Sequence, residues 1–206
     1  MTDEERVATI TRRTVIASAA LVPVTAIKSA AQTVAQPGAQ TAEPVFAAEQ
    51  RRVLEAFIGR LIPADDSGPG AVECGAANYF ERQLAGELAN EKNAILEGLA
   101  AVEAYARKAY GAGFADLAPD KQDAALTAIQ NNQAEGFTLG GGFFNRMRRL
   151  TLEGTFGDPY YGGNKGFAGW DLIRYPGARL AVAPEEQKMT PIKPAHVSAW
   201  GGNYGH

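Results

Sequence analysis

Apolar residues between positions 53 and 150 recur at the three- and four-residue spacing of helices that bury one face. No window of the chain alternates strictly enough between apolar and polar residues to predict a strand. Helices are therefore expected over residues 53–62, 76–88 and 91–110, from position 119 onward, and over 142–153. This pattern predicts an all-α fold, a compact bundle of about five helices.

Each predicted helix has an inward face, and several have a residue that marks an end. Pro63 ends the first helix, Gly111 closes the third, and Pro119 suits the first position of the fourth. The expected core side chains are apolar: Val53, Leu54, Phe57, Ile58, Leu61, Ile62, Phe80, Leu84, Ile95, Leu96, Leu99, Val102, Ala106, Ala125, Leu126, Ile129, Phe143, Met147 and Leu150.

Residues 153–177, EGTFGDPYYGGNKGFAGWDLIRYPG, form a segment rich in glycine, aromatic residues and proline. Glycine and proline interrupt it too often for one regular helix or strand, so a long loop is expected. Because large aromatic rings are costly to leave in water, Tyr160, Phe167 and Trp170 are expected to pack internally. Gly162 and Gly163 are expected to supply positive φ angles for a tight turn.

The polar residues of this loop have structural and functional interpretations. Asp158 is expected to fix a turn, and Asp171 to cap a short helix or to bridge to an arginine. Tyr161, Asn164 and Lys165 are expected on an exposed contact surface, because loops commonly carry recognition residues.

The N-terminus has the features of an export signal. Thr11, Arg12 and Arg13 precede an uncharged apolar run over residues 17–27, which Lys28 follows. The paired arginines resemble a twin-arginine signal, and the run is shorter than the ~20 residues that span a bilayer. The alternative is a general secretory signal whose basic region happens to hold two arginines. Both interpretations place the chain in the periplasm.

The chain is expected to divide into four parts: a signal segment over residues 1–31, a linker over 32–44, the helical domain over 45–177 and a C-terminal tail over 178–206. Pro and Gly residues make the tail irregular. It either lies extended over a surface or becomes ordered on a partner.

The composition argues against several classes of function. A formal net charge of −3 and a pI of about 5.5 argue against nucleic-acid binding, which needs a basic surface. The chain has no dinucleotide-binding glycine motif after a strand, no P-loop and no Cys-x-x-Cys-His. We predict no catalytic, cofactor-binding or metal-binding residue in this chain. Asp65-Asp66 is expected to form a solvated turn, and Cys74 to be a small buried apolar group, with a reactive thiol or a link to another chain as the alternative.

Three stretches of the sequence resemble a known family. They are Ile62-Pro63-Ala64-Asp65, the segment Leu117-Ala118-Pro119-Asp120-Lys121-Gln122 and, most specifically, residues 155–177. On these motifs the chain is similar to the gluconate 2-dehydrogenase subunit 3 family, the small subunit of membrane-bound sugar and sugar-acid dehydrogenases. Ala118 departs from the pattern, since a serine would be a better helix cap there.

The resemblance implies an accessory subunit with no catalytic residues of its own. The partner is then an FAD-containing flavoprotein of the glucose–methanol–choline oxidoreductase type, and a cytochrome c subunit with haem c commonly takes the electrons. The small subunit supplies the export signal, supports maturation of the flavoprotein as a chaperone does, and meets the membrane only through the complex. The partner-interface candidates are Asp158, Pro159, Tyr160, Tyr161, Gly162, Gly163, Asn164, Lys165, Trp170 and Asp171.

Two other classes of function are consistent with the residues. In one, the chain is a stand-alone periplasmic carbohydrate-active enzyme, with Asp158, Asn164, Lys165 and Asp171 as polar groups in an aromatic pocket. In the other, it is a scaffold protein without a redox partner.

Overall fold

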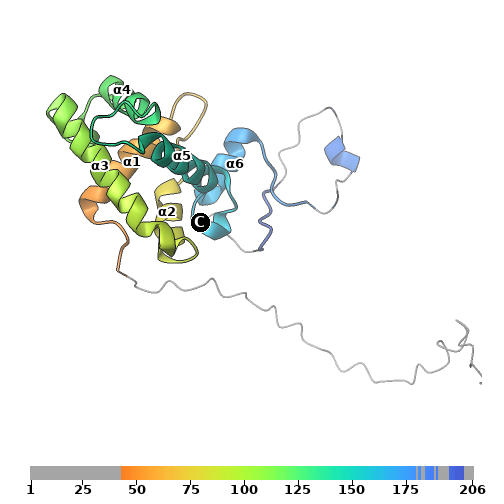
Figure 1. Cartoon of the computed structure of the whole chain (residues 1–206). Helices are drawn as coiled ribbons and strands as arrows, with labels where there is room; N and C mark the ends of the chain where they lie inside the picture. Colours follow the sequence, from red (N-terminus) through yellow and green to blue (C-terminus); the bar gives the residue numbers. More distant parts are fainter. Residues whose placement is uncertain (1–42, 180, 182–183, 188, 190–194, 202–206) are drawn as a thin grey trace, which may run out of the picture. The chain divides into compact units, whose positions relative to one another are not determined.

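The computed structural model describes residues 43–179, 181, 184–187, 189 and 195–201, so the predicted signal segment and most of the linker lie outside the described residues. The described part contains six α-helices and no strand, which confirms the all-α prediction (Figure 1). They are α1 (Ala48–Leu61), α2 (Ala76–Ala85), α3 (Lys92–Tyr110), α4 (Pro119–Gln130), α5 (Gly140–Phe156) and α6 (Ala168–Ile173). Short 3-10 turns η1 (Ala89–Glu91), η2 (Phe114–Asp116), η3 (Pro159–Tyr161), η4 (Lys165–Phe167) and η5 (Pro184–Gln187) lie between or after them.

Local sequence chemistry accounts for where several helices begin and end. α1 stops just before Pro63, whose ring disfavours helical backbone in the residue that precedes it. α3 closes at Gly111, which adopts the left-handed conformation with φ of 78°. α4 begins at Pro119 as predicted, even though Ala118 offers no side-chain cap.

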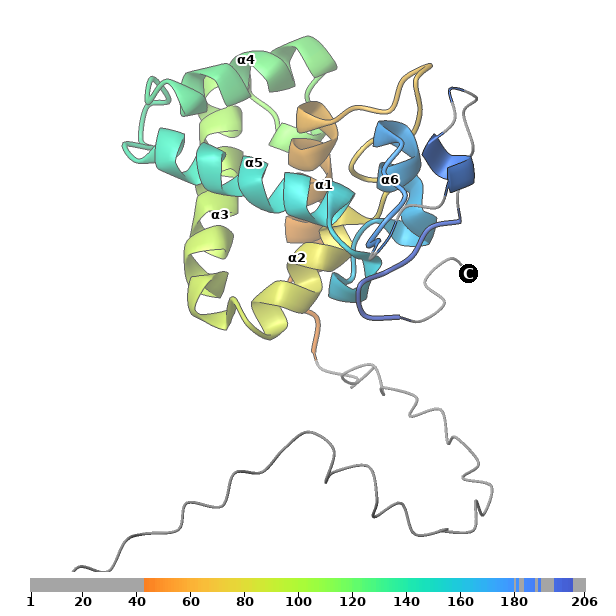
Figure 2. The same cartoon turned by 90° about the vertical axis from the view of Figure 1, so that its right-hand side faces the viewer.

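Helix α5 contacts α1, α2, α3, α4 and α6. Figure 2 shows it crossing in front of α1, with α3 and α4 toward its beginning and α2 and α6 toward its end. It begins at Gly140, two residues before the predicted start, because a glycine can pack closely there: a Cβ would lie 2.8 Å from the carbonyl oxygen of Ile129. It ends at Phe156, three residues later than predicted.

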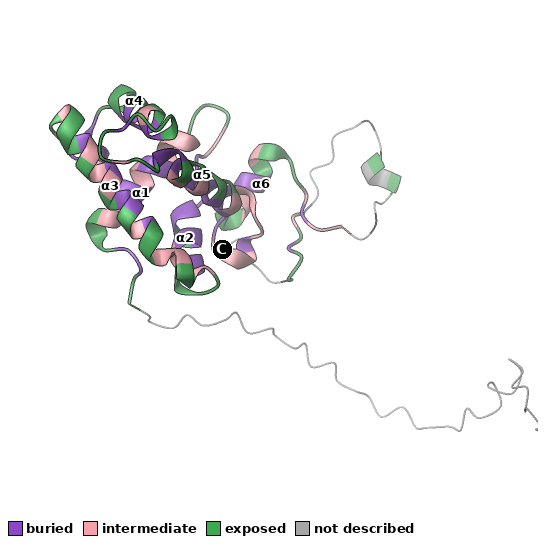
Figure 3. Ribbon diagram, viewed as in Figure 1, coloured by how far each residue is buried: buried purple, intermediate pink, exposed green. Residues whose placement is uncertain are grey.

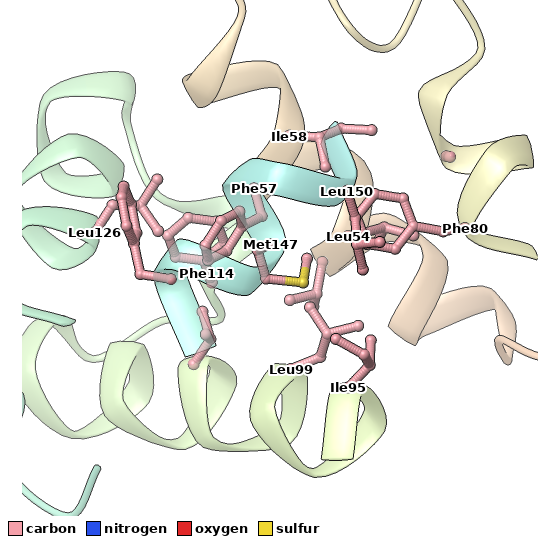
Figure 4. Close-up of a cluster of buried hydrophobic side chains, with 14 of the residues drawn as sticks. Leu54, Phe57, Ile58, Phe80, Ile95, Leu99, Phe114, Leu126, Met147 and Leu150 are labelled. Atoms are coloured by element: carbon pink, nitrogen blue, oxygen red, sulfur yellow. The ribbon is translucent and has the colours of Figure 1, made fainter. Parts of the chain in front are cut away.

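The buried faces of the helices turn toward one another, and their outer faces are exposed (Figure 3). The Phe57 ring of α1 lies 6.3 Å from that of Phe114 and 6.0 Å from that of Phe144, measured between centroids. Figure 4 shows the cluster of apolar side chains around it, which includes Leu54, Phe57, Ile58, Phe80, Ile95, Leu99, Phe114, Leu126, Met147 and Leu150. Burial of these groups is the main driving force for the fold.

Four predicted core residues lie at the edge of the cluster instead, since Leu61, Ile62, Leu96 and Phe143 are only partly buried. On α5 the next residue, Phe144, is the buried one, with 7% of its surface exposed. Phe143 packs over α3 at Gly98, where a Cβ would collide with its ring. Its ring then meets that of Phe57 edge to face at 5.9 Å.

Candidate functional site

Residues 157–177, here called the aromatic loop, follow the end of α5 and contain η3, η4 and the short helix α6. As expected, they form no single regular element, although α6 gives them one helical turn and a half. The backbone N–H of Lys165 donates to the carbonyl oxygen of Cys74 at 2.8 Å, which ties the loop to the segment before α2.

Asn164 is the buried centre of the aromatic loop. Its side-chain amide donates to the carbonyl of Gly157 at 2.9 Å, and its side-chain oxygen accepts from the N–H of Gly169 at 2.8 Å. Its own N–H donates to the carbonyl of Gly154 at 2.8 Å, and its φ of 44° is a left-handed value that asparagine tolerates. The predicted exposure of Asn164 is therefore wrong, because these three hydrogen bonds hold the residue inside the loop and leave 0% of it exposed.

The neighbouring glycines serve two different needs. Gly162 has a φ of 100°, as predicted for a tight turn. Gly163 does not have a positive φ; it is required for close approach, since a Cβ there would collide with the carbonyl oxygen of Gly154. Gly154 itself lies against α2, where a Cβ would be 2.9 Å from that of Tyr79 and 3.0 Å from the Cα of Ala76.

Trp170 is packed internally, as predicted, with 3% of its surface exposed. Its indole N–H donates to the carbonyl oxygen of Phe156 at 2.8 Å, which satisfies the one polar atom of the ring. Phe167 lies 5.2 Å away between ring centroids, and Tyr175 meets the indole edge to face at 4.9 Å. Phe167 is half-buried, so only part of it contributes to the packing.

The two adjacent tyrosines are both half-buried. Their rings meet edge to face at 5.2 Å, and the guanidinium of Arg82 lies 5.3 Å from the centroid of the Tyr160 ring, a cation–π distance. Tyr161 also packs against the main core, and its carbonyl accepts from the Gln83 side chain at 3.4 Å. Exposure of Tyr161 is thus partial, whereas Lys165 is exposed as predicted.

Both acidic residues of the loop contact the C-terminal tail. Oδ1 of Asp158 accepts from the N–H of Tyr160 at 3.0 Å, which confirms its predicted role in a turn, and also from the hydroxyl of Ser198 at 2.8 Å. Its Oδ2 accepts from the N–H of Ala199 at 2.9 Å. Asp171 lies in the first turn of α6, with its Oδ1 3.2 Å from Nε2 of His196.

The contacts with Ser198, Ala199 and His196 have no signal in the sequence. Asp158 and Ser198 are 40 positions apart, and no periodicity or motif connects them. The tail over 178–206 was expected to be irregular, and its described residues 195–201 do lie over this loop, extended up to Ser198 and turning at Ala199 and Trp200. A cavity of about 180 Å³ exists elsewhere, and none of its lining residues belongs to the aromatic loop; these are Leu61, Ile62, Arg148, Thr151 and Leu152.

Three residues outside the loop fit their structural interpretations. Cys74 is fully buried, and burial raises the pKa of its thiol, as expected for a small apolar group. Asp65 and Asp66 are exposed, and Oδ1 of Asp65 accepts from the N–H of Ser67 at 2.8 Å, as expected for a turn. Within the described residues no three His, Cys, Asp or Glu side chains are grouped to hold a metal ion.

None of the described helices combines the length and the apolar character needed to cross a membrane. No curated protein and no solved structure matches this chain. One family model matches, described as gluconate 2-dehydrogenase subunit 3, and its match runs over residues 48–177, from the start of α1 to the last residue of the aromatic loop. Because that match covers more than half of the 206 residues, the chain belongs to the gluconate 2-dehydrogenase subunit 3 family.

Proposed function

We propose that this chain is the non-catalytic small subunit of a periplasmic dehydrogenase that oxidises a sugar or sugar acid. It binds an FAD-containing flavoprotein of the glucose–methanol–choline type, supports its maturation and carries it across the membrane on the twin-arginine signal at Arg12 and Arg13. The observation that carries this proposal is membership of the gluconate 2-dehydrogenase subunit 3 family over residues 48–177. FAD then belongs to the partner, and haem c to a cytochrome c subunit that receives the electrons.

The geometry of the aromatic loop separates the predicted interface residues into two groups. Pro159, Gly163, Asn164 and Trp170 are buried, so in this proposal they hold the loop in shape. The exposed Lys165 and Asp171 can reach another protein, and Tyr161 and Gly162 lie half-buried beside them. Asp158 and Tyr160 are in contact with the tail residues Ser198 and Trp200. A loop fixed from inside presents such side chains with little loss of conformational entropy on binding.

Co-expression tests the proposal directly. The flavoprotein encoded beside this chain is expressed with and without it, and FAD content, periplasmic yield and sugar-dependent dye reduction are measured. We expect all three to fall strongly without the small subunit. Equal FAD content and equal periplasmic yield of the flavoprotein alone would contradict the proposal.

Point variants test the surface. Lys165→Glu combined with Asp171→Lys reverses two exposed charges of the aromatic loop, and we expect weaker copurification with the flavoprotein. Lys108→Glu serves as the control, because Lys108 is also exposed but lies on α3 and pairs with Glu135 at 2.6 Å. If the Lys108 variant weakens copurification as much as the Lys165 and Asp171 variant does, the interface does not lie at the aromatic loop.

The stand-alone carbohydrate enzyme has weaker support. Asn164 is buried and bonded within the loop, and both carboxylate oxygens of Asp158 already accept hydrogen bonds. Sugar oxidation or hydrolysis by the purified single chain would nevertheless establish that function in place of the accessory role.

A further inference from the structure

Residues 195–201, here called the strap, cross the aromatic loop, extended up to Ser198 and then turning at Ala199 and Trp200, where the N–H of Gly201 donates to the carbonyl of Ser198 at 3.2 Å. Val197 forms a parallel bridge with Gly177: its N–H donates to the carbonyl of Pro176 at 3.2 Å, and its carbonyl accepts from the N–H of Ala178 at 2.8 Å. Gly177 has a φ of 90°, and a Cβ there would collide with the carbonyl oxygen of Val197. The site of main-chain pairing therefore depends on a glycine.

Side chains of the strap alternate as they do in a strand that lies on a surface. Ser198 is 6% exposed and the His196 side chain 15%, whereas the intervening Val197 is 48% exposed and Ala199 is also exposed. Peptides that add to a sheet edge are recognised in this manner, by main-chain bonds and by pockets for every second side chain.

Each inward group of the strap meets a matching group of the loop. The His196 ring stacks on Phe167 at 5.1 Å and 26° and meets the edge of Trp170 at 6.0 Å, with Nε2 on the Asp171 carboxylate. The Ser198 hydroxyl donates to the Asp158 carboxylate, which also accepts from the backbone N–H of Ala199.

The last aromatic residue of the strap lies on the two tyrosines. The Trp200 ring stacks on Tyr160 at 4.8 Å and 22°, and meets Tyr161 edge to face at 6.3 Å. The backbone N–H of Trp200 donates to the Ser198 hydroxyl at 3.1 Å, and the same hydroxyl donates to the Asp158 carboxylate. About half of the Trp200 surface stays exposed, at 52%.

We propose that the aromatic loop is a binding site for a peptide that is extended up to its hydroxyl residue and turns after it, and that its occupant is the chain's own strap. The ligand class is a segment that pairs by its main chain at Gly177, places a hydroxyl on the Asp158 carboxylate and puts an aromatic ring on Tyr160 two residues later. Because the family match ends at Gly177, the site lies within the matched residues except for the N–H of Ala178, and its occupant lies beyond them. The strap is held by contacts of the kind that a separate peptide makes, so it is exchangeable.

A protease site is inserted within residues 188–194, so that no part of the chain is removed before the cut. The folded chain is then cut there, and a fluorescently labelled synthetic peptide of residues 195–201 is added. We expect the cut C-terminal fragment to co-elute with the body, and excess labelled peptide to replace it with a saturable rise in anisotropy. The uncut chain is expected to take up no peptide at micromolar concentration, since a tethered strap acts at an effective concentration of about 1 mM.

Variant peptides and one protein variant define the site. Ser198→Ala and Trp200→Ala in the peptide, and Asp158→Asn in the body, are each expected to weaken binding about tenfold, the usual effect of losing a charge-assisted bond or a stacked ring. Val197→Ala, at an outward position, is the matched control and is expected to change affinity less than about twofold.

Two results would overturn the proposal. One is a cut body that keeps its helical circular dichroism and its thermal transition, yet binds no peptide. If cutting unfolds the body, hydrogen exchange of the uncut chain takes the place of the peptide assay. The amides of Val197, Ala178 and Ala199 are then expected to be protected, because each donates a hydrogen bond between the strap and the loop. Unprotected amides at all three positions in the uncut chain would show that the strap does not occupy the site.

Discussion

The side-chain oxygen of Asn164 accepts a hydrogen bond from the backbone N–H of Gly169 at 2.8 Å, inside the aromatic loop. On its other side, the Asn164 amide donates to the carbonyl of Gly157. One side chain thus joins the first residue of the loop to the start of α6. The shape of the proposed docking surface depends on this buried amide more than on the exposed residues.

Asn164→Ala leaves the N–H of Gly169 and the carbonyl of Gly157 without their partners. Because each buried unsatisfied group costs about 1–3 kcal/mol, we expect the free energy of unfolding to fall by about 2–5 kcal/mol in urea denaturation. Lys165→Ala, at the exposed neighbouring position, is the control, with an expected change of about 0.5 kcal/mol or less. Equal stability of the two variants would show that the loop does not depend on Asn164.

Cys74 is expected to be inert in the folded protein. Its thiol is fully buried and burial raises its pKa, so both access and the thiolate fraction are low. An aromatic disulfide reagent at pH 8 should react slowly with the native chain and with one equivalent in denaturant, since the chain has one cysteine. Rapid reaction without denaturant would contradict the buried position.

Arg60 and Asp123 should give stability that depends on pH. Nε and Nη2 of Arg60 each lie 2.7 Å from a carboxylate oxygen of Asp123, and this hydrogen bonding lowers the pKa of that carboxyl. A lowered folded-state pKa means that the stabilisation is complete above the unfolded value of about 3.9 and is lost as pH falls through the folded value.

Asp123→Asn is therefore expected to reduce the free energy of unfolding by about 0.2–1 kcal/mol at pH 7, the range for pairs near the surface. The difference from the parent chain should disappear when urea denaturation is repeated as pH falls from above the unfolded pKa through the lowered folded-state pKa of Asp123. Glu135→Gln is the control, because its partner Lys108 makes one contact between more exposed side chains. A difference that stays constant with pH would contradict the assignment to Asp123.

Arg12→Lys combined with Arg13→Lys tests the export signal. We expect both this chain and its flavoprotein partner to accumulate in the cytoplasm, because the twin-arginine pathway reads the arginine pair. Arg6→Lys keeps that pair and is expected to leave the periplasmic yield unchanged. Normal export of the doubly substituted chain would favour the general secretory signal instead.

The five long helices were predictable because each buries one face, and the resulting periodicity is visible in the sequence. The stripe Ile95, Leu99, Val102 and Ala106 is buried as expected. The choice between Phe143 and Phe144 was not predictable. It depends on Gly98 of α3, because this glycine has no side chain and so leaves room for the Phe143 ring.

A short helix near Asp171 was one expectation, but the bounds of helix α6 could not be predicted, since six residues are too few for a periodic pattern or for stability on their own. Tertiary contacts hold it instead, among them the close approach of Gly169 to the carbonyl of Thr155 and the bond from Trp170 to Phe156. Burial of Asn164 was missed for a similar reason. A polar side chain is expected to be exposed unless the backbone groups that satisfy it are known.

Gly154 of α5 contacts both the helical bundle and the aromatic loop. Its Cα lies against Ala76 and Tyr79 of α2, and its carbonyl accepts from the N–H of Asn164, with Gly163 closely packed beside it. Opening the aromatic loop alone would expose this junction, and separating α2 from α5 would release the loop. The loop and the bundle should therefore melt in one cooperative transition, with amide exchange in the two regions governed by the same opening event.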